Sequence, residues 1–237
     1  MLSRKLGNAL ETTKTGFNIY SLVFDGTDEG VTINGVNDSF SSDQGTITFW
    51  AKVDTMTSSS IFIAFYVDAD NFVRIQYQTY YNEVRGYYKG GGSPVYAKAT
   101  DAIENDGKWH NITFTWDTSA DEIKLYLDGT LKQTTGSLPE FEGDIAKSAI
   151  GNNSTGGNYV KATITKVAVF NQVKSASLLM ANTQEPLDLA GMEGLLGYWK
   201  FDEGSGSTAF DGSGNGNNGT LENSPPYTTD VPYKANA

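Results

Sequence analysis

The stretch GYWKFDEGSGSTAFDGSGNGNNGT, residues 197–220, opens as an aromatic run and continues as a segment rich in Gly, Ser, Asn and Asp. These four residue types favour turns and do not fill a helix or a core. The stretch therefore predicts a strand over residues 195–201, followed by a loop rich in turns and side-chain oxygens.

The residues before this stretch alternate between apolar and polar side chains. In GTITFWAKVD, residues 45–54, Ile47 and Phe49 alternate with Thr48 and Trp50. A period of two is typical of a strand with one buried face. Turn residues separate nearly all such runs, and we expect strands over residues 20–25, 31–34, 45–53, 60–67, 71–79, 84–89, 109–117, 122–128, 131–135, 146–151 and 160–170.

Residues 108–135, KWHNITFTWDTSADEIKLYLDGTLKQTT, predict how neighbouring strands connect. They contain a strand, a polar turn, a second strand and the pair Asp128-Gly129, which is a hairpin signal. An antiparallel meander is the simplest interpretation, so the predicted fold class is all-β. One short helix is expected over residues 175–182, with Ser175 as its N-cap.

Length and composition restrict the classes of function. The chain has 237 residues and a net charge of −11, and a length of this order suits a single β-sandwich. Nucleic acid is not an expected partner, because phosphates are neutralised by clustered Lys and Arg. Without cysteine, disulfides, thiolate metal sites and thiol catalysis are excluded. Neither a secretory signal nor a membrane anchor is visible in the sequence, and a membrane is not an expected partner.

Four segments, in this order, resemble laminin-G-like jelly rolls of the concanavalin A-like lectin and glucanase superfamily. They are FDGTDEGVTI at 24–33, TITFWAKVD at 46–54, KWHNITFTWD with LYLDG at 108–129, and AIGN running into ITKVAVFN at 149–171. The resemblance implies an antiparallel jelly-roll β-sandwich with one short helix. Laminin-G-like jelly rolls that resemble this one occur among the structural proteins of tailed bacteriophages.

The resemblance implies a single domain over residues 19–224, between an N-terminal arm, 1–18, and a C-terminal tail, 225–237. Two departures from the family pattern stand out. The aromatic strand usually precedes the FDG strand, whereas here it follows the rest of the sheet, so we expect residues 195–203 to fold back as a closing strand. Relatives commonly carry an acidic pair where this chain has Thr165 and Lys166, which argues against a calcium site on that strand.

Calcium is the cofactor for which the sequence offers ligands. It binds six to eight oxygens, and loops at one end of a sandwich supply them readily. The alternative is that these side chains set turns by accepting hydrogen bonds from nearby backbone amides. The candidate metal ligands are Asp25, Asp202, Asp211 and Asn215.

A glycan or a protein interface is predicted for IQYQTYYNEVRGYYKGGGSPVY, residues 75–96, where tyrosines stand among amides and an arginine. Aromatic faces stack on sugar CH groups while polar side chains bind the hydroxyls. Packing of strand tyrosines is the alternative. The four tryptophans, at positions 50, 109, 116 and 199, are expected in the core. The candidate binding residues are Tyr77, Tyr80, Tyr81, Asn82, Arg85, Tyr87, Tyr88 and Tyr96.

Catalysis is not expected. His110, the single histidine, lies in a strand match, and we find no E-x-D-x-x-E run of the kind that the glucanases carry. We therefore expect a non-enzymatic structural or decoration protein of a bacteriophage virion that binds host surface glycans. Its partners would be other virion proteins, docked through residues 1–18 or a sheet edge, or further copies of the chain. The alternatives are a secreted or cell-surface carbohydrate-binding module and, third, a glycoside hydrolase.

Overall fold

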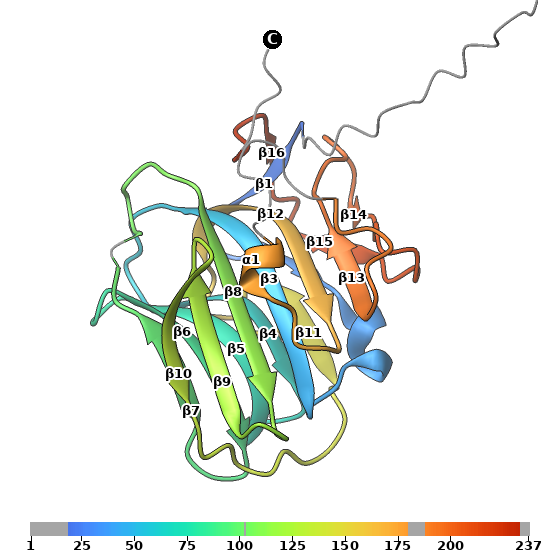
Figure 1. Ribbon diagram of the computed structural model, residues 1–237. Helices are drawn as coiled ribbons and strands as arrows, with labels where there is room; N and C mark the ends of the chain where they lie inside the picture. Colours follow the sequence, from blue (N-terminus) through green and yellow to red (C-terminus); the bar gives the residue numbers. More distant parts are fainter. Residues whose placement is uncertain (1–18, 102, 180–187, 233–237) are drawn as a thin grey trace, which may run out of the picture.

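The computed structural model describes residues 19–101, 103–179 and 188–232. These residues form two antiparallel sheets that face each other (Figure 1). Sheet A has the order β10-β9-β8-β3-β12-β1-β16, with β13 also paired to β12, and sheet B has the order β14-β15-β2-β11-β4-β5-β6-β7. This is the predicted all-β jelly-roll sandwich. The strands of sheet A are β1 (Ser21–Asp25), β3 (Gln44–Val53), β8 (His110–Asp117), β9 (Glu122–Leu127), β10 (Thr130–Thr135), β12 (Lys161–Phe170), β13 (Leu195–Trp199) and β16 (Tyr227–Thr228).

Sheet B contains the segment for which ligand binding is predicted. Its strands are β2 (Gly30–Thr32), β4 (Ser60–Tyr66), β5 (Asn71–Gln78), β6 (Glu83–Gly90), β7 (Val95–Ala99), β11 (Lys147–Ile150), β14 (Thr208–Ala209) and β15 (Gly219–Glu222).

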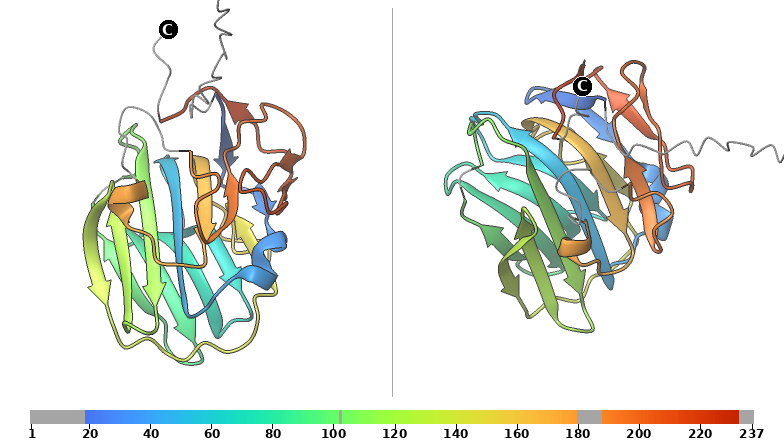
Figure 2. Two further views of the ribbon diagram at one scale, coloured as in Figure 1. Left: turned by 45° about the vertical axis from the view of Figure 1, so that its right-hand side comes forward. Right: turned by 45° about the horizontal axis from the view of Figure 1, so that its top comes forward.

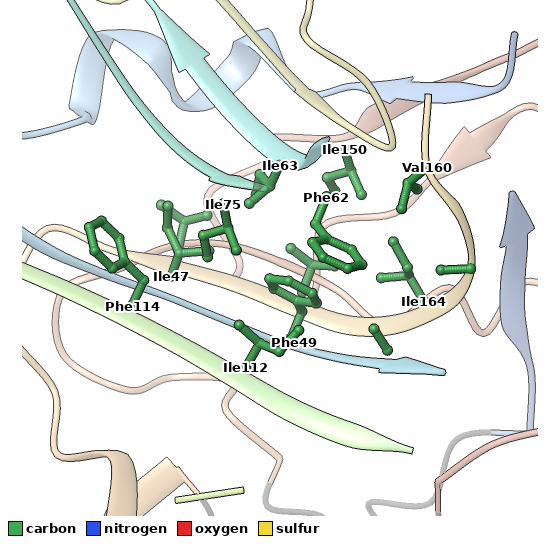
Figure 3. Packing of buried hydrophobic residues seen from close by; sticks show 14 of the residues in the cluster. Ile47, Phe49, Phe62, Ile63, Ile75, Ile112, Phe114, Ile150, Val160 and Ile164 are labelled. Atoms are coloured by element: carbon green, nitrogen blue, oxygen red, sulfur yellow. The ribbon is translucent and has the colours of Figure 1, made fainter. Parts of the chain in front are cut away.

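The core fills the space between the sheets. Ile47 and Phe49 of β3 and Phe114 of β8 lie in one buried cluster with Ile63 of β4 and Ile75 of β5 (Figure 3). The alternation read in residues 45–54 sends Ile47 and Phe49 inward, as expected for a strand with one buried face. Full burial of such side chains contributes about 1.5–3 kcal/mol each to folding.

The stretch 197–220 closes both sheets. β13 pairs with β12 in sheet A, while β14 and β15 extend sheet B next to β2. Trp199, at the end of β13, is fully buried, and its indole N–H donates to the carbonyl of Asn217 at 2.9 Å. The residues between the strands therefore form a structured loop anchored on the indole.

The outer side of sheet A is covered in part by the helix α1 (Ala176–Leu179), which lies over the sheet (Figures 1 and 2). Leu179 packs with Phe170 of β12 and Tyr198 of β13 in a second buried cluster. The predicted helix 175–182 is shorter in the described residues, and its last three positions lie outside them. No helix within the described ranges combines the length and the hydropathy needed to cross a membrane.

Several features differ from the sequence-based expectations. The strand β7 and the 3-10 helix η1 (Asn34–Ser39) were not predicted, and β14 and β15 lie in the part of the chain for which a loop was expected. Residues 225–232 are not a free tail, because β16 pairs with β1. The predicted arm, 1–18, lies outside the described residues.

Of the four tryptophans expected in the core, Trp116 and Trp199 are fully buried. Trp50 and Trp109 are only partly buried. Trp50 belongs to the polar half of the β3 alternation, which faces away from the core.

Candidate functional site

The outward side chains of β4, β5, β6 and β7 form the candidate site, which we call the outer face of sheet B. On β5 the core takes Val73, Ile75 and Tyr77, so the residues between them point outward. β6 follows the same rule, with Val84 and Tyr88 in the core. The outward residues of the face include Tyr66, Phe72, Arg74, Gln76, Arg85, Tyr87 and Tyr96, and Glu83, Lys89 and Lys98 point to the same side.

Strand register sets the order of side chains across this face. Arg74 lies opposite Tyr87, which in turn lies opposite Tyr96. In the adjacent row Gln76 lies opposite Arg85. Each row thus places a guanidinium group beside aromatic or amide side chains.

Both guanidinium groups stack on aromatic rings. The Cζ atom of Arg74 is 4.4 Å from the ring centroid of Phe72 and 5.1 Å from that of Tyr87. The Arg85 Cζ atom is 4.6 Å from the Tyr81 centroid and 4.4 Å from that of Tyr96. Cation–π attraction of this kind stabilises each pair by about 0.5–2 kcal/mol.

The charge of Arg85 is balanced within the protein. Its Nε and Nη2 atoms donate to one carboxylate oxygen of Glu83 at 2.8 and 2.7 Å, and Lys98 donates to the other oxygen at 2.7 Å. Burial opposes ionisation of Glu83, but these two cations outweigh it and hold its pKa below the ordinary value. Glu83 is therefore a stable carboxylate.

Arg74 is less completely satisfied. Its Nη1 donates to the hydroxyl of Tyr66 at 2.6 Å, whereas its buried Nε has no hydrogen-bond partner among the described residues. The same holds for the Oε1 atom of Gln76, a side chain that is only 5% exposed. Buried polar atoms without a partner are uncommon and costly, and here a donor and an acceptor of this kind stand two residues apart on one strand.

The turn from β5 to β6 places two of the predicted ligand residues at the rim of this face. Tyr80 is 87% exposed and Tyr81 is 56% exposed, and their rings meet edge to face with centroids 4.8 Å apart. Asn82 takes a left-handed conformation with φ 54° and accepts a hydrogen bond from the Tyr77 hydroxyl. Asn82 therefore shapes the turn.

The structure corrects the prediction for Tyr77 and Tyr88, which are fully buried and cannot contact an external ligand. Strand alternation turns both rings into the core. The Tyr77 hydroxyl shares its single proton between the Asn82 oxygen and Glu104, whose carboxylate oxygen lies 2.9 Å away. Burial together with this carboxylate raises the Tyr77 pKa. Burial, with the charge of Asp43, raises the Tyr88 pKa to about 12.

Several residues of the outer face were not in the predicted set, among them Tyr66, Phe72, Arg74 and Gln76. The signal that locates them is the alternation itself. Arg74 stands two positions before Gln76 and three before the inward Tyr77, so it shares the outer side of β5.

The predicted calcium ligands do not form one cluster. Asp25 ends β1, while Asp202 accepts hydrogen bonds from the amides of Ile19 and Tyr20 just before the start of that strand. The described residues contain no group of three or more acidic or histidine side chains placed to hold a metal ion. Calcium binding stays a prediction.

Asp211 and Asn215 order the loop after β13. The Asp211 carboxylate accepts from the amides of Tyr198, Ser213 and Asn217 at 2.8–2.9 Å. The Asn215 side chain donates to two carbonyls of β13 at 2.7 and 3.1 Å. These contacts match the alternative interpretation, in which the side chains set turns.

The departure at Thr165 and Lys166 falls on an irregularity of β12, where its register with β3 shifts. Lys166 is buried in a left-handed conformation with φ 53°. Burial lowers its pKa to about 8, against the attraction of Asp188. Thr165 Oγ1 donates to the carbonyl of Lys200 at 2.6 Å and is likewise enclosed.

His110 is held between two aspartates. Its ring nitrogens lie 2.7 Å from Asp128 and 3.0 Å from Asp106. The hydrogen bond with Asp128 is the largest cause of a raised His110 pKa, and it outweighs the effect of burial. The histidine thereby ties the 128–129 turn to the loop before β8.

Comparison with known proteins extends these observations. The sequence profile described as the concanavalin A-like lectin/glucanases superfamily matches residues 25–178, more than half of the chain. A search of the curated proteins gave no match.

Among solved structures, a proposed carbohydrate-binding protein of Bacteroides ovatus superposes with a TM-score of 0.68 at 16% identity, over 92% of this chain and 62% of its own. The chain thus spans less than two-thirds of that protein. Domain 4 of an extracellular arabinanase of Geobacillus stearothermophilus, solved with arabinotriose, gives 0.55 at 18% identity over 68% of this chain and 75% of its own.

A sialidase carbohydrate-binding module of Ruminococcus gnavus, bound to α2,3-sialyllactose, gives a TM-score of 0.55 at 14% identity over 70% of this chain and 98% of its own. At these identities the likeness concerns the fold, while the profile match over residues 25–178 concerns the sequence itself. The chain therefore belongs to the concanavalin A-like lectin/glucanases superfamily.

Proposed function

We propose that the protein is a carbohydrate-binding module that holds its ligand on the outer face of sheet B. The observation that carries this proposal is the unpaired donor and acceptor, Arg74 Nε and Gln76 Oε1, set among stacked aromatic rings. A hydroxyl group can accept one hydrogen bond and donate another. Both atoms are covered, so the two side chains must turn outward for a ligand hydroxyl to reach them. Sugars offer such hydroxyls together with CH faces that stack on aromatic rings.

The rings that border this pair suit a sugar. Tyr87 and Tyr96 lie side by side with centroids 5.4 Å apart. Tyr87 is only 5% exposed, so the half-buried Tyr96 and the exposed Tyr81 of the neighbouring turn offer the stacking surface. Ligand pockets typically combine aromatic surface with a few fixed polar groups. The three structural relatives, whose names or bound sugars refer to carbohydrate, support the same class of ligand.

We propose binding without catalysis. Glycoside hydrolysis uses a pair of carboxyl groups, of which the acid has a raised pKa. On the outer face the strand register places one carboxylate, Glu83, among the described residues, and its pKa is lowered by its two cations. Incubation with the sugars that the protein binds should leave them intact by chromatography, and release of shorter products would refute this part.

A glycan array with the labelled protein tests the binding site. Tyr81→Ala removes an exposed ring that stacks on Arg85, and we expect about a tenfold loss of affinity, which corresponds to 1.4 kcal/mol. Phe210→Ala is the matched control, since Phe210 is 61% exposed outside this face. Absence of binding to any glycan, or an equal loss in both variants, would contradict the proposal.

Sedimentation of the same variants tests the competing occupant, a second copy of the chain. A dimer that dissociates on Tyr81→Ala would identify the face as a subunit interface. We expect Tyr81→Ala and the unsubstituted protein to sediment alike.

We propose in addition that the module is displayed on a bacteriophage particle, as the sequence resemblance suggests; a secreted or cell-surface module is the alternative. Mass spectrometry of purified particles tests this location. Deletion of residues 1–18 should abolish incorporation and leave glycan binding unchanged. Absence of the protein from the particles would refute the virion location and leave the sugar site untouched.

A further inference from the structure

The outer face of sheet B differs in charge from the rest of the molecule. The chain as a whole carries a net charge of −11. Yet the register places four basic side chains on β5, β6 and β7 of this face, and among the described residues Glu83 is the carboxylate that shares it. The basic residues are Arg74, Arg85, Lys89 and Lys98.

Three of these four cations are already paired. Arg85 and Lys98 share Glu83, and Lys89 lies 2.8 Å from Asp70. The described residues offer no carboxylate in ion-pair contact with Arg74. Arg74 is therefore the cation whose charge remains for a ligand.

The free edge of Arg74 has the shape that a carboxylate fits. Its Nη1 is occupied by Tyr66, while Nε lacks a partner. Nε and its neighbour Nη2 form the side edge of the guanidinium, where two parallel hydrogen bonds to one carboxylate can form. Nε is covered and Arg74 is partly buried, so a carboxylate reaches this edge only after rotation about the last side-chain bonds has turned it outward.

Resting on the proposed function, we propose that the module selects glycans that carry a carboxylate, the uronic or sialic acid class, and that Arg74 binds the carboxylate. Gln76, on the same side of β5, accepts a hydrogen bond from a neighbouring hydroxyl. Phe72 and Tyr87 border the guanidinium, with ring centroids 4.4 and 5.1 Å from the Arg74 Cζ atom.

Titration calorimetry with matched sugars tests this selectivity. Polygalacturonate is compared with its fully methyl-esterified form, and sialyllactose with lactose, so that each pair differs in charge on one scaffold. Dextran sulfate against dextran tests sulfate as the source of the anion. We expect at least one carboxylated member to bind about ten times more tightly than its neutral partner, as a charge-assisted hydrogen bond implies.

Variants assign the effect to Arg74. Arg74→Gln should remove the preference, about tenfold in affinity, while Arg74→Lys should retain part of it because the charge remains. Lys174→Gln is the control, since this lysine lies over Phe170 on the other sheet. Equal melting temperatures establish that the variants are folded. If Arg74→Gln is not folded, the comparison of Arg74→Lys with the unsubstituted protein tests the proposal.

The outcomes separate the two proposals. Equal affinity for charged and neutral partners, a preference that survives Arg74→Gln, or a stronger preference for sulfate overturns the selectivity for carboxylates. If neutral sugars bind and Tyr81→Ala weakens that binding, the proposed carbohydrate-binding function stands without the selectivity for carboxylates. If no sugar binds, both proposals fail.

Discussion

Replacement of Asp211 by alanine tests whether its carboxylate anchors the loop of the closing stretch 197–220. The side chain accepts from three backbone amides and from the hydroxyl of Ser213 at 2.7 Å. A hydrogen bond to a charged group contributes about 1.5–3 kcal/mol when buried. Because these amides are partly buried and can turn to water, we take about 1–1.5 kcal/mol for each of the three, or about 3–5 kcal/mol in total.

A loss of this size is measurable by thermal unfolding. For a domain of this length each kcal/mol lowers the melting temperature by about 2–4 °C, so Asp211→Ala should lower it by about 6–20 °C. Asp211→Asn keeps one acceptor oxygen and should lose about half as much. Asp144→Ala, at an exposed carboxylate, should change stability by less than about 0.5 kcal/mol. If Asp211→Ala behaves like Asp144→Ala, the anchoring role is refuted.

The remaining predictions concern one glycine and two titratable side chains. Gly86→Ala would place a Cβ 2.1 Å from the Phe114 ring, and we expect a loss of about 1–3 kcal/mol by chemical denaturation. His110→Gln should lower the free energy of unfolding more at pH 6 than at pH 9. The His110 pKa is raised in the folded state, so the charged ring stabilises the fold below its ordinary pKa of 6.5, and this stabilisation is lost as the pH rises through the folded-state pKa. Asp230→Ala breaks the 2.8 Å ion pair that holds the C-terminal segment to β3, and proteolysis near residue 228 should accelerate; equal cleavage would contradict the anchoring role.

Calcium can be tested on the same proteins. If Asp211 ligates calcium, millimolar calcium should raise the melting temperature of chelator-treated protein, and Asp211→Ala should abolish the rise. The turn-setting interpretation predicts no effect of calcium on either protein.

Most strands of the sandwich could be predicted because each carries its own alternation. The run around Phe49 shows it, and the observed β3, Gln44–Val53, lies within a residue of the predicted range. β7 was missed because Val95–Ala99 is short and follows a run of Gly, Ser and Pro that favours a turn. Its place as a strand is set by pairing with β6, which one sequence does not reveal.

The candidate site could be predicted only in part because composition does not distinguish the two faces of a strand. Tyr87 and Tyr88 are neighbours in the sequence, yet one lies on the outer face and the other in the core. The alternation that runs through Ile75 and Tyr77 assigns the sides correctly when it is continued through each strand. The density of tyrosines identifies the segment that contains the candidate site, but it does not show which of its side chains face the surface.

Net charge is a poor guide to the ligand for a related reason. The excess of acidic residues argues against a polyphosphate as partner of the whole surface, but a binding face responds to the charges within one Debye length, about 8–10 Å. Within the described ranges the one carboxylate on the outer face of sheet B is Glu83, which Arg85 and Lys98 share, while Arg74 keeps its charge between two rings. An acidic protein can therefore select an acidic sugar, and raising the salt concentration should weaken that binding more than the binding of a neutral one.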